Sequence, residues 1–192
     1  MPAREHTGRR RNEAARRAVL DATSRILHDE GPGALTVGHI ADTAGVGRQT
    51  IYRWWPGRAA IVLETATDLA TREVPMPDTG TVDGDLRAFV TDTFTAAGGR
   101  ARPLLRGMVA AALEDTDVAA GLARFTARRR AVLADMLQRH DVVDVADAAP
   151  LAELVYGTLW YRVLITDGPL DADAADALTD LLLRIVDPQH GG

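Results

Sequence analysis

One stretch of the sequence decides the fold: Leu35-Thr36-Val37-Gly38-His39-Ile40-Ala41-Asp42-Thr43-Ala44-Gly45-Val46-Gly47-Arg48-Gln49-Thr50-Ile51-Tyr52-Arg53-Trp54-Trp55. Thr36 can cap a short helix over residues 37–44, because its hydroxyl can accept a hydrogen bond from a free N–H of the first turn. Gly45 tolerates the left-handed backbone that ends such a helix, and a second short helix follows over residues 48–54. Two short helices joined by so tight a turn predict a helix-turn-helix.

The second short helix leaves Arg48, Gln49, Thr50, Tyr52 and Arg53 exposed. These side chains offer guanidinium, amide, hydroxyl and phenol groups. Base edges in the major groove and phosphate oxygens are bound by groups of this kind. The stretch therefore predicts double-stranded DNA as a partner.

The residues that carry the motif also carry a family resemblance. The run Leu35-Thr36-Val37…Ile40-Ala41…Ala44-Gly45-Val46…Thr50-Ile51-Tyr52-Arg53…Trp55…Arg58 resembles the DNA-binding domain of TetR-family transcriptional repressors. The resemblance implies a homodimer that places one recognition helix per protomer in a major groove of a palindromic operator. It also implies a C-terminal domain in which an unidentified small-molecule effector switches DNA affinity.

The resemblance assigns roles to individual residues. Arg48 and Gln49 open the recognition helix and are expected at base edges, where a good bidentate pair discriminates by about 1–3 kcal/mol. Arg53 is expected at a base or a phosphate; for Trp54, packing is an equal alternative to a backbone contact, and Trp55 is expected to be buried. The candidates for contacts with the DNA backbone are Thr36, His39, Thr50, Tyr52, Arg53, Trp54 and Arg58.

Charge is distributed unevenly along the chain. The net charge of −5 divides into +4 over residues 1–58 and −9 over residues 59–192. A basic N-terminal region followed by an acidic remainder is typical of a protein that binds a polyanion through one end. The arginines of residues 9–11 and 16–17 are accordingly expected to form an arm that touches phosphate or the minor groove.

Composition excludes several other classes. Hydrophobic residues make up 46% and charged residues 26% of the chain, and there is no cysteine, which excludes disulfides, Cys-ligated zinc and iron–sulfur clusters. The five histidines never recur at helical ligand spacing, and no nucleophile–base set stands out. We therefore expect no metal, no cofactor and no catalytic residue. Without an apolar stretch near the roughly 18 residues that span a bilayer, we expect a cytoplasmic protein.

Apolar residues recur at helical spacing almost throughout, which predicts an all-α fold. We place the domain border between residues 58 and 59, in a connecting helix that ends before Pro75-Met76-Pro77. The expected domains are a basic arm with the helix-turn-helix over 1–58, and a helical ligand-binding and dimerisation domain over 59–192. Further helices are expected over residues 12–30, 82–97, 102–114, 117–139, 150–166 and 172–186.

Two sets of residues in the second domain are candidates for function. Two late helices carry apolar stripes that, paired across a two-fold axis, predict a four-helix dimer interface: Leu151, Leu154, Val155, Thr158, Leu159, Arg162, Leu178, Leu181, Leu182 and Ile185. A ligand cavity is expected among Phe89, Phe94, Leu105, Arg106, Met108, Leu113, Phe125 and Trp160, each of which is alternatively plain core. Arg106 either anchors an anionic ligand or pairs with an acid on a neighbouring helix.

Three functional hypotheses follow. The leading one is a dimeric repressor released from its operator by a small molecule. The second is a helix-turn-helix regulator without a small-molecule ligand. The third is a helical enzyme or interaction module with a coincidental motif, which predicts equal affinity for cognate and scrambled duplexes.

Overall fold

A computed structural model describes residues 5–99, 101–141 and 145–186, together with the side chains of all of these except 5–11 and 145–147. Over these residues the chain is helical and contains no strand, as predicted. The N-terminal elements are α1 (Glu5–Asp29), the 3-10 turn η1 (Pro32–Ala34), α2 (Val37–Ala44), α3 (Arg48–Tyr52) and α4 (Arg58–Glu73). The remaining elements are α5 (Val82–Gly98), α6 (Ala101–Ala112), α7 (Thr116–Arg139), α8 (Val145–Tyr161), the π-helical η2 (Arg162–Thr166) and α9 (Ala172–Val186).

Local chemistry produces the predicted helix-turn-helix. The Thr36 hydroxyl accepts a hydrogen bond from the His39 amide at 3.0 Å and so caps α2. Gly45 ends α2 with φ of +66°, a conformation that glycine adopts without steric cost. α3 is shorter than the predicted 48–54, because the Trp54 amide bonds to the Ile51 carbonyl at 2.9 Å and tightens the chain into a turn.

A small core joins this motif to the rest of the molecule. Ile40, Ile51 and Trp55 are buried, and α1 packs against both α2 and α4. Trp55, buried as predicted, also donates its indole N–H to the Glu64 carboxylate in α4 at 2.7 Å. The helix-turn-helix is therefore attached to α4 by packing and by a hydrogen bond.

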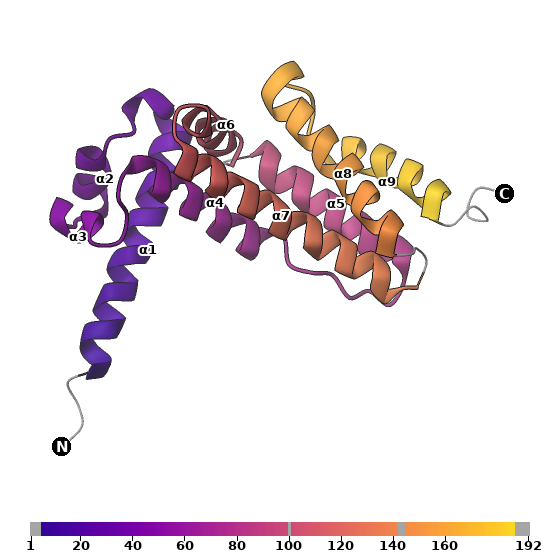
Figure 1. The fold of residues 1–192 in the computed structure, drawn as a ribbon, viewed down its shortest axis with the longest axis horizontal. Helices are drawn as coiled ribbons and strands as arrows, with labels where there is room; N and C mark the ends of the chain where they lie inside the picture. Colours follow the sequence, from indigo (N-terminus) through magenta and orange to yellow (C-terminus); the bar gives the residue numbers. More distant parts are fainter. Residues whose placement is uncertain (1–4, 100, 142–144, 187–192) are drawn as a thin grey trace.

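The molecule is elongated, with the helix-turn-helix and the last helices at opposite ends (Figure 1). The helix-turn-helix occupies one end, while α5, α8 and α9 form the other. α4 lies between them and packs against α1, α5, α6 and α7, and α7 runs along α8. Within the described residues, no helix combines the length and apolarity that crossing a membrane requires.

A buried carboxylate fixes the loop between α4 and α5. Asp85 has a fully buried side chain and accepts hydrogen bonds from the Thr79 amide at 2.6 Å and the Thr79 hydroxyl at 2.7 Å. Arg139 and His140, at the end of α7, approach its other oxygen at 3.2 and 2.7 Å. Burial alone raises the pKa of Asp85, but the hydrogen bonds from Thr79 and His140 outweigh it and hold the pKa below the ordinary 3.8.

Candidate DNA interface and ligand pocket

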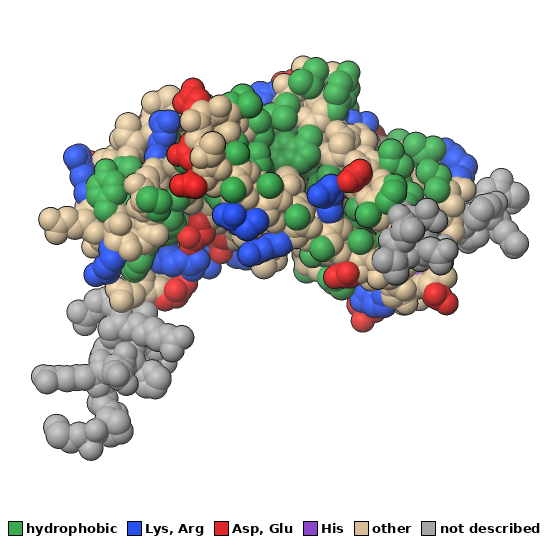
Figure 2. Space-filling model, viewed as in Figure 1, with side chains coloured by type: hydrophobic (Ala, Val, Ile, Leu, Met, Phe, Trp, Pro, Cys, Tyr) green, Lys and Arg blue, Asp and Glu red, His purple; other side chains and the backbone are tan. Residues whose placement is uncertain are grey.

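The face of α3 that the sequence nominates for DNA is open to solvent. Arg48, Gln49, Tyr52 and Arg53 are exposed, Tyr52 by 56%, and Thr50 is half-buried. Arginine side chains are visible on the surface at the end of the molecule that carries α2 and α3 (Figure 2). These side chains can meet a duplex without any rearrangement of the core.

Arg48 lies back against α2, over Gly38. A Cβ atom placed on Gly38 would stand 2.7 Å from Nη2 of Arg48, which is closer than real Cβ contacts. Gly38 therefore leaves the space in which the Arg48 guanidinium lies. Because Arg48 is exposed and long, it can swing from this position to a base edge.

His39 is already bonded within the chain. Its Nδ1 lies 3.1 Å from the Ala34 carbonyl and its Nε2 lies 3.4 Å from the Glu30 carboxylate. Both ring nitrogens thus have partners, and the ring ties α2 to η1 and the end of α1. A phosphate contact would have to replace the Glu30 contact, so the expected role of His39 fits this geometry poorly.

Arg53 and Trp54 form a stacked pair beside the recognition helix. The Arg53 guanidinium lies 5.4 Å from the Trp54 ring centroid and donates a hydrogen bond to Asn12 at 3.2 Å. Trp54 is half-buried and packs edge-on against Trp55 at 5.4 Å. Most contacts of the Trp54 side chain are therefore packing contacts. The stack also holds the Arg53 guanidinium at the edge of α3.

Other basic residues of the N-terminal region hold the fold together. Arg58, at the start of α4, is exposed and donates a hydrogen bond to the Leu35 carbonyl at 3.0 Å, and so ties α4 to the start of α2. Arg16 and Arg17 pair with Glu64 and Asp68 of α4 rather than projecting as an arm. α1 begins at Glu5, earlier than predicted, and the side chains of the arginines at 9–11 lie outside the described residues.

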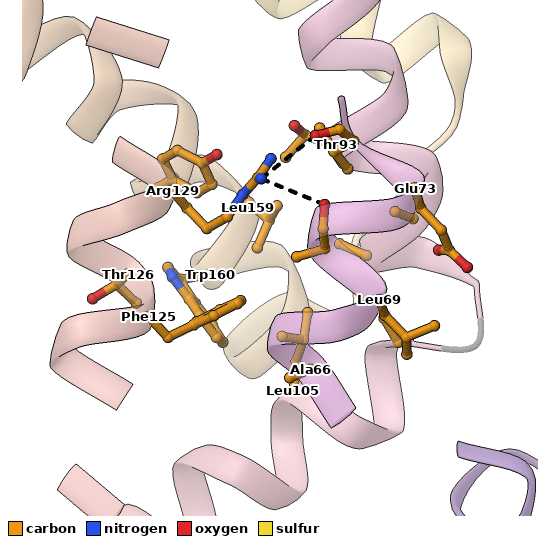
Figure 3. A pocket seen from close by; sticks show the side chains of 16 residues that line it. Ala66, Leu69, Glu73, Thr93, Leu105, Phe125, Thr126, Arg129, Leu159 and Trp160 are labelled. Carbon is orange, nitrogen blue, oxygen red and sulfur yellow. Dashed lines mark hydrogen bonds between the residues drawn. The ribbon is translucent and has the colours of Figure 1, made fainter. Parts of the chain in front are cut away.

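The C-terminal region contains an apolar pocket with a volume of about 60 Å³. Its walls come from α4, α5, α6, α7 and α8. Figure 3 shows Ala66 and Leu69 of α4 lying opposite Phe125, Thr126 and Trp160. The pocket is lined by Ala66, Leu69, Ala70, Glu73, Val74, Thr93, Ala96, Ala97, Ala101, Leu105, Phe125, Thr126, Arg129, Tyr156, Leu159 and Trp160.

Only some of the predicted lining residues reach this pocket. Leu105, Phe125 and Trp160 line it. Four other candidates do not line this pocket: Phe89, Phe94 and Met108 are completely buried and follow the alternative of plain core, and Leu113 is 84% exposed. Arg106 follows its alternative interpretation: it pairs with Asp167 at 3.0 Å and donates to the Val163 carbonyl at 2.6 Å.

The polar residues of the pocket were missed by sequence reasoning. Thr93, Arg129 and Tyr156 come from α5, α7 and α8 and meet at one wall. Arg129 stands within Arg128-Arg129-Arg130, a run that indicates a solvated face. The available signal was that Arg129 lies one turn after Phe125, on the same face of α7.

The predicted dimer stripes divide between core and surface. The side chains of Leu151, Val155, Leu159, Leu178 and Leu182 are buried within one chain, so they have little surface to offer a partner. Arg162 lies over the Phe94 ring and donates to the Pro169 carbonyl at 2.9 Å. Leu154, Leu181 and Ile185 are about half exposed, and apolar side chains are visible over α8 and α9 in Figure 2.

A capped helix-turn-helix with an exposed polar helix, joined through one helix to a helical body with a pocket, defines the class of helix-turn-helix transcriptional regulators. Residues 19–65 match the family described as "Bacterial regulatory proteins, tetR family". Residues 76–182 match "Tetracyclin repressor-like, C-terminal domain". The chain belongs to the TetR family of transcriptional regulators, as its sequence motif indicated.

Relatives of similar length agree with this assignment. The HTH-type transcriptional regulator YdeS of Bacillus subtilis is 31% identical over 83% of each chain. AqdR of Rhodococcus erythropolis, also an HTH-type transcriptional regulator, is 29% identical over 95% of this chain and 89% of its own. Among solved structures, the TetR family transcription regulator SCO0332 superposes with a TM-score of 0.72 at 30% identity, covering 90% of this chain and 97% of its own. Membership of a family of regulators weighs against the hypothesis of a helical enzyme.

Proposed function

We propose that the protein is a dimeric repressor that leaves a palindromic operator when a small molecule enters the pocket between α4 and α7. One observation carries this proposal: α4 belongs to both regions. Glu64 of α4 holds Trp55 of the helix-turn-helix, while Ala66, Leu69 and Ala70, on the next turns, form a wall of the pocket. A ligand that displaces this wall displaces the support of the recognition helix.

The small size of the pocket supports such a coupling. A cavity of about 150 Å³ accommodates benzene in a protein core, whereas this pocket measures about 60 Å³. A ligand of even modest size therefore has to push the walls apart. Because α1 and α4 are joined by pairs such as Arg17–Asp68 at 2.6 Å, a shift of α4 moves α1 and the motif with it.

Dimerisation is proposed through the surfaces of α8 and α9 that one chain leaves uncovered. Leu154, Tyr161, Leu181 and Ile185 are each between 47% and 57% exposed. Large apolar side chains gathered on neighbouring helices favour association. Two recognition helices one DNA turn apart bind more tightly than one short helix alone.

DNA recognition is proposed to divide between bases and backbone. Arg48 and Gln49 read bases, while Tyr52 and Arg58 contact phosphates. We expect Arg48→Ala and Gln49→Ala to lose about 1–3 kcal/mol of discrimination between cognate and mutated operators. Tyr52→Phe and Arg58→Ala should weaken binding to all duplexes alike, as measured by fluorescence anisotropy. Uniform weakening by all four variants would contradict this division.

The operator is found by selecting bound duplexes from a random pool at two salt concentrations. Recovery of an inverted repeat is the expected result, since a two-fold dimer reads two half-sites. Recovery of no motif at either salt concentration would refute sequence-specific regulation. Recovery of a single half-site would refute the dimer but would still support sequence-specific binding by the helix-turn-helix.

A further inference from the structure

We infer that the effector is an apolar monocarboxylate whose carboxylate is bound by Arg129, Tyr156 and Thr93 inside the pocket. This inference rests on the proposed ligand-responsive function and specifies the chemistry of its site. Three hydrogen-bonding groups in one wall of the pocket are buried without a well-formed hydrogen bond, and they are the basis of the inference.

The three groups come from different helices and converge. Nη2 of Arg129, the Tyr156 hydroxyl and the Thr93 hydroxyl are each buried, and none of them makes a well-formed hydrogen bond to any described residue; Arg129 and Thr93 approach the Tyr156 hydroxyl only as weak partners. Both Arg129 and Thr93 lie near enough to the Tyr156 hydroxyl to lower its pKa, although the larger effect of burial raises the pKa above 10.0. Tyr156 therefore remains a neutral O–H donor at physiological pH. Buried polar groups rarely stay unpaired, so three together indicate a missing ligand group.

Arg129 is positively charged, and no carboxylate among the described residues pairs with it. Its Nη1 lies 3.4 and 3.5 Å from the carbonyls of Ala70 and Val74 (Figure 3). Its guanidinium also lies 5.7 Å from the Phe89 ring centroid. Within the described part of the chain, it forms no ion pair with a carboxylate. A ligand that brings a negative charge would supply the missing partner.

The donors fit a carboxylate and the remaining walls fit an apolar body. A carboxylate accepts several hydrogen bonds through two oxygens, which matches one guanidinium N–H group and two hydroxyls. Opposite the polar wall lie Ala66, Leu69 and Phe125, which offer no hydrogen bonds. Glu73 is the acidic residue of the lining and is exposed. It would favour a cation instead, so an amine is the necessary competing ligand.

The probes are octanoate, octan-1-ol and octylamine, measured by isothermal titration calorimetry with the full-length protein. Their unbranched bodies are matched, so each probe has to widen the pocket to the same extent and the three differ only in the head group. The expected result is that octanoate binds at least tenfold more tightly than the alcohol or the amine. Equal binding of the acid and the alcohol, tighter binding of the amine, or no binding of octanoate would each overturn the inference.

Tyr156→Phe is the decisive variant, because it removes only an oxygen that makes no well-formed hydrogen bond. A hydrogen bond to a charged group corresponds to roughly tenfold to a hundredfold in affinity, so octanoate binding should weaken by about that factor. The melting temperature of the unliganded protein should stay the same or rise. A fall in melting temperature with unchanged octanoate affinity would show a structural role and overturn the inference.

Another residue of the pocket offers a control. Thr126 also lines the pocket, but its hydroxyl already donates to the Ala123 carbonyl at 3.0 Å, so Thr126→Val should leave the preference for the acid unchanged. Arg129→Gln should abolish that preference, although it also removes the contacts with α4.

Two readouts separate the ligand class from the proposed function. If octanoate binds the protein but the protein stays on the selected operator, the inferred ligand class is supported and ligand-controlled repression is refuted. If octanoate does not bind, but a compound of another class binds the protein and causes it to release the operator, the carboxylate inference is refuted. The proposed ligand-controlled repression is then supported.

Discussion

Two buried polar clusters lie between α5 and α7, and they differ in how far their hydrogen bonds are completed. At one end of α5, every neighbour of Asp85 is engaged: Thr79, Arg139 and His140 all bond to its carboxylate. Two turns further along α5, Thr93 faces Tyr156 and Arg129, and the two hydroxyls and Nη2 of Arg129 make no well-formed hydrogen bond, although Nη1 of Arg129 donates to the Ala70 and Val74 carbonyls. A completed network stabilises the fold, whereas an incomplete one is costly unless a ligand completes it.

The largest expected effect comes from breaking the completed cluster. Asp85→Ala would leave Arg139, His140 and the Thr79 amide without their shared acceptor. Water can partly replace the carboxylate at Arg139 and His140, whose side chains are 39% and 17% exposed, so we expect the lost hydrogen bonds to a charged group to cost about 1–3 kcal/mol. Urea unfolding of the variant should show a loss of this size. A matched control is Asp180→Ala, which removes an exposed ion pair with Arg87 and should cost less than about 1 kcal/mol.

The pH dependence of stability tests the same cluster with a smaller effect. Because the folded pKa of Asp85 lies below its unfolded value of 3.8, its stabilisation is present above about pH 4 and is lost as the pH falls through the folded pKa. The stability difference between the wild type and Asp85→Ala should therefore shrink between about pH 5 and pH 3. A difference that stays constant over this interval would mean that the carboxylate is not held in its charged form.

The smallest effect is expected in the incomplete cluster. Thr93→Val keeps the shape of the side chain and removes a hydroxyl that makes no well-formed hydrogen bond, so stability should stay the same or rise by up to about 1 kcal/mol. Thr179, between α9 and α5, also has a buried unpaired hydroxyl but lies outside the pocket. Thr179→Val should have the same effect on unfolding and, unlike Thr93→Val, should leave octanoate binding unchanged. A loss above about 1 kcal/mol for Thr93→Val would reveal a structural bond.

The sequence predicted the helix-turn-helix well because its determinants are local. Thr36 as a cap, Gly45 as the left-handed turn and Trp55 as core all depend on residues within a few turns of one another. The contact of Trp55 with Glu64 was not predicted, since it depends on how α4 packs.

The pocket and the dimer face were harder to predict because they depend on helices distant in sequence. Apolar periodicity could not separate Phe89, which is core, from Phe125, which lines the pocket. On α8 and α9 the stripes were found, but the buried and exposed sides were not distinguished: Leu182 is core, whereas Leu181 is exposed. Arg129 resembled its solvated neighbours because only the tertiary structure places it beside Tyr156.

The most direct test measures DNA affinity of the helix-turn-helix while the pocket that holds the incomplete cluster is filled. Fluorescence anisotropy with the selected operator gives the Kd with and without saturating octanoate, for the wild type and Tyr156→Phe. The account predicts that octanoate weakens operator binding at least tenfold in the wild type, and that the variant needs a higher octanoate concentration for the same effect. An operator Kd that does not change when calorimetry shows the pocket to be occupied would contradict it.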